Sequence, residues 1–285
     1  MAVEKRTGSA EQIEQFVACH GVQPYYRLPI VPKLSVTIIT KNEAGDIAAA
    51  LQSVSWADER IVVDSGSTDG TVAIATPLAD RVVVHEWGGY AAQKNHAASL
   101  ASHDWILSLD ADERVTPALA AEIQQRLREE PSERGFRIPR VTWHLGRWIR
   151  TTDWYPDHQL RLYDRRAAQW VGRHVHEGVN VNGRVGTLRS ELQHYAYRDI
   201  AEHEETIDHY TTLAAQQMFE QGRYASAFDV VLQPAFAFFR NYILKRGFLD
   251  GRVGLTISKM NAHYVALKFQ KLRELESRTP SHEPR

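Results

Sequence analysis

The sequence lacks the features that mark disulfide-stabilised, secreted and membrane-spanning proteins. Cys19 is the only cysteine among 285 residues, which excludes an intrachain disulfide and a cluster of thiolate metal ligands. No run of about 18 uncharged apolar residues occurs, so we expect no membrane span. The first residues also lack the apolar core of a signal peptide. We therefore expect a cytoplasmic protein.

Two familiar phosphate-binding loops are missing as well. No Gly-x-Gly-x-x-Gly follows the first predicted strand, and no Gly-Lys-Ser or Gly-Lys-Thr loop occurs. A nucleotide would therefore be held by polar and acidic strand ends together with a metal ion. The formal net charge of −1 excludes no class of partner by itself. We expect no nucleic-acid partner.

From residue 34 onward, the sequence shows a repeating pattern of strands and helices. Residues 34–40, 60–64, 81–85 and 105–109 read as β-branched or apolar strands, and helical stretches lie between them. Strands that alternate with helices at this spacing predict an α/β fold with a mostly parallel sheet. We expect three parts: an extension at 1–33, a catalytic domain at 34–198 and a helical region at 199–285.

Acidic side chains follow the most apolar of these strands. Asp110, Asp112 and Glu113 come directly after residues 105–109. In an extended backbone, residues two apart point the same way, so Asp110 and Asp112 are expected to aim at one spot. Two carboxylates can hold Mg²⁺ or Mn²⁺ and leave positions open for phosphate. An acidic, solvated turn is the alternative.

Asp64 ends the second predicted strand and opens a tight polar loop at 65–70. Its carboxylate can accept hydrogen bonds from a base or a ribose, or it can cap the loop. Because ligands bind at the carboxyl ends of strands in open α/β sheets, we favour ligand binding.

Four motifs occur in a fixed order: Thr-Lys-Asn-Glu at 40–43, Val-Val-Asp-Ser-Gly-Ser-Thr-Asp-Gly-Thr at 62–71, Gln-Lys-Asn at 93–95 and Leu-Asp-Ala-Asp-Glu at 109–113. Together they resemble the family 2 glycosyltransferases, over about residues 34–195. Four ordered motifs are far more specific than any one of them. The resemblance implies a GT-A fold, a nucleotide-diphospho-sugar donor and inversion at the anomeric carbon.

The resemblance also implies roles for particular residues. Those expected to bind the nucleotide sugar are Thr40, Asn42, Glu43, Asp64, Lys94 and Asp110. Asp110 and Asp112 are expected to hold the divalent cation, with His176 touching the metal or orienting a neighbouring group.

Later motifs, at 146–148, 154–157, 161–163 and 175–177, resemble a narrower branch. This branch is the bacterial lipopolysaccharide core glycosyltransferases, similar to β-1,4-glucosyltransferases that act on inner-core heptose. It implies UDP-glucose as the donor and a lipopolysaccharide core, or another lipid-linked anionic acceptor, as partner. The extension of some 30 residues departs from that branch.

Between Arg134 and Arg189 the sequence has eleven Arg, no Lys and four acidic residues. Arginine binds carboxylate or phosphate with two parallel hydrogen bonds, which suits an anionic acceptor. A general preference of the genome for Arg codons is an equally good explanation. Inverting transfer also needs a base; we expect Glu177, with Asp157 as the second candidate, and a surface salt bridge is the alternative for each.

The C-terminal part is expected to be helical, with apolar aromatics at 228–243 and ten Lys or Arg against four acids from Arg240 onward. This combination is typical of helices lying on anionic lipid, although packing on the catalytic domain or on a second subunit explains it as well. We expect a peripheral protein on the cytoplasmic face of the inner membrane. The rival functions are transfer to polyprenyl phosphate and non-catalytic binding of a sugar nucleotide.

Overall fold

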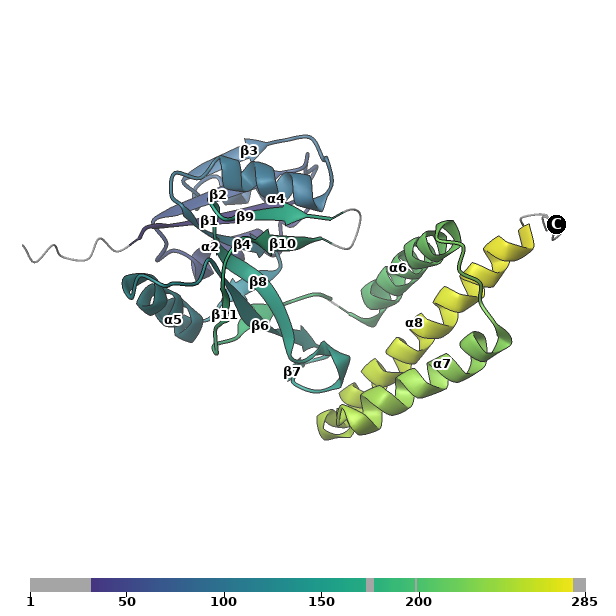
Figure 1. Cartoon of the computed structure of the whole chain (residues 1–285). Coiled ribbons are helices and arrows are strands. Elements are labelled where there is room, and N and C mark those ends of the chain that lie inside the picture. Colours follow the sequence, from purple (N-terminus) through teal and green to yellow (C-terminus); the bar gives the residue numbers. More distant parts are fainter. Residues whose placement is uncertain (1–31, 173–176, 198, 279–285) are drawn as a thin grey trace, which may run out of the picture. The chain divides into compact units, whose positions relative to one another are not determined.

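The computed structural model describes residues 32–172, 177–197 and 199–278. A mixed sheet with flanking helices is built from residues 34–194, and a helical region follows from Ile200 (Figure 1). Within the described ranges, none of the helices combines the length and apolar character that crossing a membrane requires. The predicted extension lies almost wholly outside the described residues, so the expected domain boundaries stay predictions.

The first half alternates strands and helices, as the pattern predicted. Its elements are β1 (Leu34–Thr40), α2 (Ile47–Ser53), β2 (Glu59–Asp64), α3 (Thr71–Ala75), β3 (Arg81–Val84), α4 (Tyr90–Ser99), β4 (Trp105–Asp110), β5 (Glu113–Val115) and α5 (Pro117–Arg128). The helix α5 begins where expected, because the Thr116 hydroxyl accepts the Leu119 N–H at 3.1 Å and Pro117 needs no donor in the first turn.

The second half adds mainly antiparallel strands and then the helices. These elements are β6 (Gly135–His144), β7 (Arg147–Ile149), β8 (Asp157–Asp164), β9 (Ala168–Val171), β10 (Gly178–Val181), β11 (Val185–Thr187), β12 (Leu192–His194), α6 (Ile200–Glu220), α7 (Ala227–Phe239) and α8 (Gly251–Arg278).

The two faces of the sheet are buried by different helices. Val62 and Leu107 face α2, α3 and α5, whereas their neighbours Val63 and Ile106 face α4. This alternation follows from the two-residue period of a strand. Strands covered on both faces explain the continuous apolar runs in the sequence.

The order of the strands places the carboxyl end of β1 at a switch point. The sheet runs β3-β2-β1-β4-β8-β6-β12-β5, with β1 parallel to both β2 and β4. The chain therefore moves outward from β1 through β2 and β3 and then returns to the other side of β1. Ligands in open α/β sheets bind in the crevice at such a point.

One expectation about the sheet is wrong. Pro139 predicted an edge strand, yet β6 lies inside the sheet, with β8 on one side and β11 and β12 on the other. The register explains how proline fits: β11 pairs with residues 135–137 and β12 with residues 140–142. Pro139 falls between these two partners, where a missing N–H breaks no ladder on that side.

The C-terminal helices pack around α8. Ala215 and Met218 of α6 meet Phe269 and Leu272 of α8 in a small apolar core. Near its start, α8 approaches the turn that follows α7 so closely that a Cβ on Gly254 would lie 1.9 Å from the Gly247 carbonyl oxygen. Only glycine fits there.

Polar contacts join this helical region to the turn after β7. Asn241 donates from Nδ2 to Asp153 at 2.8 Å and accepts the Asp153 N–H at 2.9 Å. Asp250 accepts from Thr151 at 2.5 Å and pairs with Arg147 at 2.8 Å. Asn241 and Asp250 are almost completely buried, so losing either partner would leave an unsatisfied group.

Candidate functional site

A cleft of about 1250 Å³ opens where β1 and β4 end. Its lining includes five of the ten residues singled out from the sequence: Thr40, Glu43, Asp110, Asp112 and Glu177. The volume exceeds the roughly 300–1,000 Å³ of most small-molecule pockets, which leaves room for two substrates. His176 lies outside the described residues.

Four of the sequence candidates do not line this cleft: Asn42, Asp64, Lys94 and Asp157. Asn42 holds a loop, because its Oδ1 accepts the Thr68 N–H at 2.8 Å and its own N–H donates to Ser67 at 2.8 Å. Asn42 is left-handed, with φ of 58°, a conformation that asparagine tolerates better than most residues.

Asp64 is a loop cap in this structure. Its Oδ1 accepts the N–H groups of Gly66 and Ser67 at 2.9 and 2.8 Å, and Oδ2 accepts the Ser67 hydroxyl. Only 1% of Asp64 is exposed. The capping explanation of Asp64 is therefore observed, and its contact with a nucleotide stays a prediction.

The acidic segment after β4 differs from the extended arrangement that the sequence predicted. The strand ends at Asp110, residues 111–112 form a turn, and β5 begins at Glu113. The turn is held in part by Glu113, whose Oε2 accepts the Asp110 N–H at 3.1 Å. Asp110 and Asp112 nevertheless both line the cleft, although a turn and not an extended backbone connects them.

Asp110 is surrounded by cations. Lys94 Nζ lies 3.0 Å from Oδ1, and the Arg161 guanidinium bonds Oδ2. Burial by itself raises the pKa of Asp110, but Arg161 and Lys94 outweigh it and hold this pKa far below its usual range. Asp110 is therefore ionised at any physiological pH.

Glu113 forms ion pairs with two arginines close to Asp110. Its Oε1 lies 2.7 Å from Arg161 and 3.1 Å from Arg140, and its side chain is fully buried. Arg161 and Arg140 both line the cleft. Cations held this firmly can stabilise negative charge that develops in the cleft, because their position costs no reorganisation during a reaction.

Asp112 has a carboxylate oxygen without a partner. His194 Nε2 lies 3.2 Å from Oδ2, whereas Oδ1 is buried and bonded to nothing in the described part of the chain. Burial raises the pKa of Asp112, and the hydrogen bond from His194 reverses this, so the net pKa is lowered. A buried, unpaired carboxylate oxygen of this kind could accept a cation or a hydrogen-bond donor.

The carboxylates of Asp110 and Asp112 fit a hard divalent ion whose remaining ligands are water and substrate phosphate. Among the described residues, no three His, Cys, Asp or Glu side chains converge in a way that could enclose a metal. Mg²⁺ is commonly held by one or two carboxylates together with substrate phosphates and water. Asp112, with Asp110 beside it, provides that type of site.

The two candidate bases lie in different surroundings. Glu177 lines the cleft, is about one-fifth exposed, and lies 3.6 Å from Lys94. Asp157 is held by Arg140 at 2.7 Å and by the Gln159 amide at 2.6 Å. Of the two, only Glu177 lines the cleft, so the geometry favours Glu177.

Lys94 is a buried cation that contacts two carboxylates of the cleft. It is 2% exposed, and its Nζ lies 4.4 Å from the centre of the Trp170 ring while contacting Asp110 and Glu177. Lys94 does not line the cleft, and its predicted contact with the nucleotide sugar stays a prediction.

Several important residues were not chosen from the sequence: Arg140, Arg161, His194, Trp170 and Tyr210. The excess of arginine between residues 134 and 189 was a signal for the first two. Nothing in the sequence indicated that His194 would contact Asp112 or that Tyr210 would line the cleft.

Comparison with known proteins agrees with this geometry. The sequence model described as "Glycosyl transferase family 2" matches residues 35–183. An uncharacterized glycosyltransferase of Rickettsia felis is 34% identical over 255 residues, which is 85% of this chain and 90% of the relative. The lipopolysaccharide core biosynthesis glycosyltransferase LpsC of Rhizobium meliloti is 30% identical over 87% of this chain and 97% of its own.

A solved structure shares the fold. The mannosyltransferase of Pyrobaculum calidifontis, in complex with GDP-Man and Mn²⁺, aligns with 92% of this chain and 94% of its own, with a TM-score of 0.51 and 16% identity. The predicted GT-A-like sheet with a helical C-terminal region is thereby confirmed.

Proposed function

We propose a specific reaction for this chain, which belongs to glycosyl transferase family 2 and is a glycosyltransferase: it transfers glucose, with inversion, from UDP-glucose to a lipopolysaccharide inner-core acceptor. One observation carries the proposal. The unpaired Asp112 oxygen, the clamped Asp110 and the Glu177 carboxylate line one cleft at the switch point of the sheet. The relative LpsC, named for lipopolysaccharide core biosynthesis, supports the acceptor class.

The donor would lie with its diphosphate near the acidic turn. Asp112 and Asp110 would hold Mg²⁺ or Mn²⁺, which stabilises the diphosphate as it leaves. The Pyrobaculum enzyme of the same fold was solved with a sugar nucleotide and Mn²⁺. Thr40 and Glu43 line the same cleft, and Asp64 holds the neighbouring loop in shape. These contacts, with Asn42 and Lys94, form the proposed donor site.

Glu177 acts as the base in this proposal. In an inverting displacement the acceptor hydroxyl loses its proton as its oxygen attacks the anomeric carbon, and UDP leaves from the opposite side. Glu177 accepts that proton. Lys94, 3.6 Å away, fixes the position of this carboxylate in the cleft wall.

The test is a pair of isosteric substitutions. Glu177→Gln should keep the melting temperature and the UDP affinity but lose turnover by roughly 10²–10⁴-fold, the usual worth of a general base. Asp157→Asn is the matched control: it breaks the bonds to Arg140, so it should lower the melting temperature with only a modest loss of rate. If Asp157→Asn is stable and inactive while Glu177→Gln turns over, the assignment is reversed.

The helical region supports a position on the membrane surface. Apolar side chains on α7 and the two turns after it are exposed: Phe228, Val231, Leu232, Phe236, Phe239, Ile243, Leu244, Phe248 and Leu249. Those on α7 recur at helical spacing and so form one stripe. Lys245, Arg246 and Arg252 are exposed beside the stripe, and none forms an ion pair within the described residues. Apolar area next to free cations fits an anionic bilayer.

Vesicle sedimentation tests this position. The chain should bind vesicles containing phosphatidylglycerol, bind phosphatidylcholine vesicles weakly, and be released by salt. Lys245→Glu combined with Arg252→Glu should weaken binding, whereas the control pair Lys33→Glu with Arg128→Glu changes the net charge equally on exposed residues away from α7. Equal loss in both pairs, or no binding by the unchanged protein, contradicts the proposal.

The rival functions are separated by substrate. A chain that transfers sugar to polyprenyl phosphate but not to core oligosaccharide belongs to the first rival class. A sugar-nucleotide binding protein without catalysis should bind UDP-glucose with Mn²⁺ and neither transfer nor hydrolyse it. Asp110, Asp112 and Glu177 all line one cleft, which argues against the second rival, since binding alone does not need a base.

A further inference from the structure

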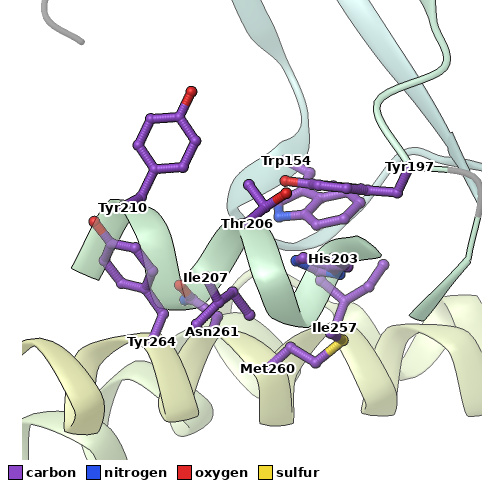
Figure 2. A pocket seen from close by; sticks show the side chains of 10 residues that line it. All are labelled: Trp154, Tyr197, His203, Thr206, Ile207, Tyr210, Ile257, Met260, Asn261 and Tyr264. Carbon is purple, nitrogen blue, oxygen red and sulfur yellow. The ribbon is translucent and has the colours of Figure 1, made fainter. Parts of the chain in front are cut away.

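A second pocket lies between α6, α8 and the turn that carries Trp154. Figure 2 shows its lining, with Trp154 and Tyr197 on one side, His203 reaching toward them from α6, and Tyr264 and Met260 rising from α8. Its volume is about 190 Å³. This is below the roughly 300–1,000 Å³ of pockets for drug-sized ligands, and it suits one small ring.

The lining is aromatic and polar but uncharged. It consists of Trp154, Tyr197, His203, Thr206, Ile207, Tyr210, Ile257, Met260, Asn261 and Tyr264. Aromatic faces pack against the C–H surfaces of a sugar, and hydroxyl, amide and imidazole groups bond its hydroxyls. A phosphate or carboxylate would find no cation in this lining.

His203 has an open hydrogen-bonding position. Its side chain is stacked on Tyr197, with ring centres 4.1 Å apart, and only 5% of the residue is exposed. The Nδ1 atom is buried without a partner among the described residues. A buried polar atom in a pocket wall favours a ligand with hydroxyl groups over an acyl chain, which could not bond it.

The pocket adjoins the cleft through Tyr210, which lines both. Burial raises the pKa of Tyr90 to about 12, and Tyr210, Glu177 and Asp110 add to the shift. Tyr90 is itself in the cleft wall. Tyr210 and Glu177 line the same cleft, so a ligand that extends from the second pocket past Tyr210 enters the cleft that holds the proposed base.

We propose that this second pocket is an acceptor subsite, which binds a neutral sugar ring next to the acceptor sugar that receives glucose. The inference rests on the proposed function. It adds that the acceptor is recognised through at least two units, and that the unit in this pocket carries no charge.

A plug of the pocket tests the subsite. Thr206→Trp places an indole in the pocket wall, and Thr256→Trp is the matched control. Each hydroxyl bonds a carbonyl of the preceding helical turn, at 2.8 and 3.0 Å, but Thr256 lines neither pocket. The probe is heptose-containing core oligosaccharide released from lipid A by mild acid. Calorimetry measures its binding, and UDP affinity reports whether the donor cleft is intact.

We expect the oligosaccharide to bind the unchanged protein and the Thr256→Trp variant alike. Thr206→Trp should weaken binding by about tenfold or more, which corresponds to about 1.4 kcal/mol, and should raise the acceptor KM more than it lowers kcat. Tyr264→Phe keeps the shape of the pocket and should raise the acceptor KM by about 2–10-fold, the worth of one hydrogen bond. This variant decides the matter if Thr206→Trp does not fold.

Three outcomes overturn the subsite. The unchanged protein fails to bind the oligosaccharide, or Thr206→Trp and Tyr264→Phe bind it as tightly as the unchanged protein does. The third is that laurate, a probe for an acyl chain, binds at this pocket more tightly than the oligosaccharide. Failure of the proposed function is a different result. In that case the unchanged protein neither transfers glucose nor hydrolyses UDP-glucose, whatever the variants bind.

Discussion

Glu113 allows the sharpest test of how the site is built. Its Oε1 faces Arg161 and Arg140, at 2.7 and 3.1 Å, and its Oε2 accepts the Asp110 N–H at 3.1 Å. Glutamine has one oxygen and one NH₂ group. In Glu113→Gln, either the NH₂ meets two guanidinium groups or it meets the Asp110 N–H, so one side of the contact is always donor against donor.

Removing one partner of a buried ion pair costs about 3–5 kcal/mol. Because glutamine keeps one acceptor, we expect a loss of about 2–3 kcal/mol in the free energy of unfolding of Glu113→Gln. For a chain of this size that lowers the melting temperature by about 4–12 °C. Scanning calorimetry and urea unfolding should agree on the loss.

Glu129→Gln is the matched control for this substitution. Glu129 pairs with Arg126 at 3.3 Å, and both side chains are 48% exposed, so the pair is worth at most about 0.5 kcal/mol. The same chemical change should therefore be nearly silent at residue 129. If Glu113→Gln melts within about 1 °C of Glu129→Gln, the two arginines are not held by Glu113 and the reasoning fails.

Three further predictions concern the other ionisable groups. Asp112→Ala should abolish turnover and make UDP binding independent of Mn²⁺, as measured by calorimetry with and without the metal. If UDP binding by this variant still depends on Mn²⁺, Asp112 is not a ligand of the cation. Asp64→Ala should raise the KM for UDP-glucose more than it lowers kcat; a large fall in kcat at unchanged donor affinity contradicts a binding role. His203 has a pKa lowered to about 4, by burial and then by His144, so the unfolded chain takes up its proton first and stability falls as the pH drops from 6.5 toward 4. Between pH 7 and pH 5 the unchanged protein should lose about 2 kcal/mol more than His203→Gln in urea unfolding, and parallel losses would contradict the shift.

The sequence predicted the parallel part of the fold well, for a local reason. The strands β1 and β4, and most of β2, are buried on both faces, so each appears as a short apolar run that ends in polar residues. The acidic residues after β4 were identified from the sequence because they are neighbours in the chain. The shape of their backbone was not predicted, since the turn depends on a hydrogen bond from the Asp110 N–H to the Glu113 side chain.

The cationic half of the site could not be found in this way. Arg161 and Glu113 are 48 residues apart, and Arg140 and Glu113 are 27 apart. Their meeting requires the order β4-β8-β6 in the sheet, and no local pattern gives that order. The second pocket is more remote still, because Trp154 and Ile257 come together only when α8 packs beside the turn after β7.

Strand register gives the two candidate carboxylates different surroundings. Gln159 and Arg161 of β8 line the cleft, and Asp157 lies on the same face two residues earlier, since alternate residues of a strand share a face. Asp157 is the register partner of Arg140, so its charge is paired across the strands before any substrate arrives. Glu177 follows β9, lies outside these paired strands and lines the cleft beside Lys94, so it stays the proposed base.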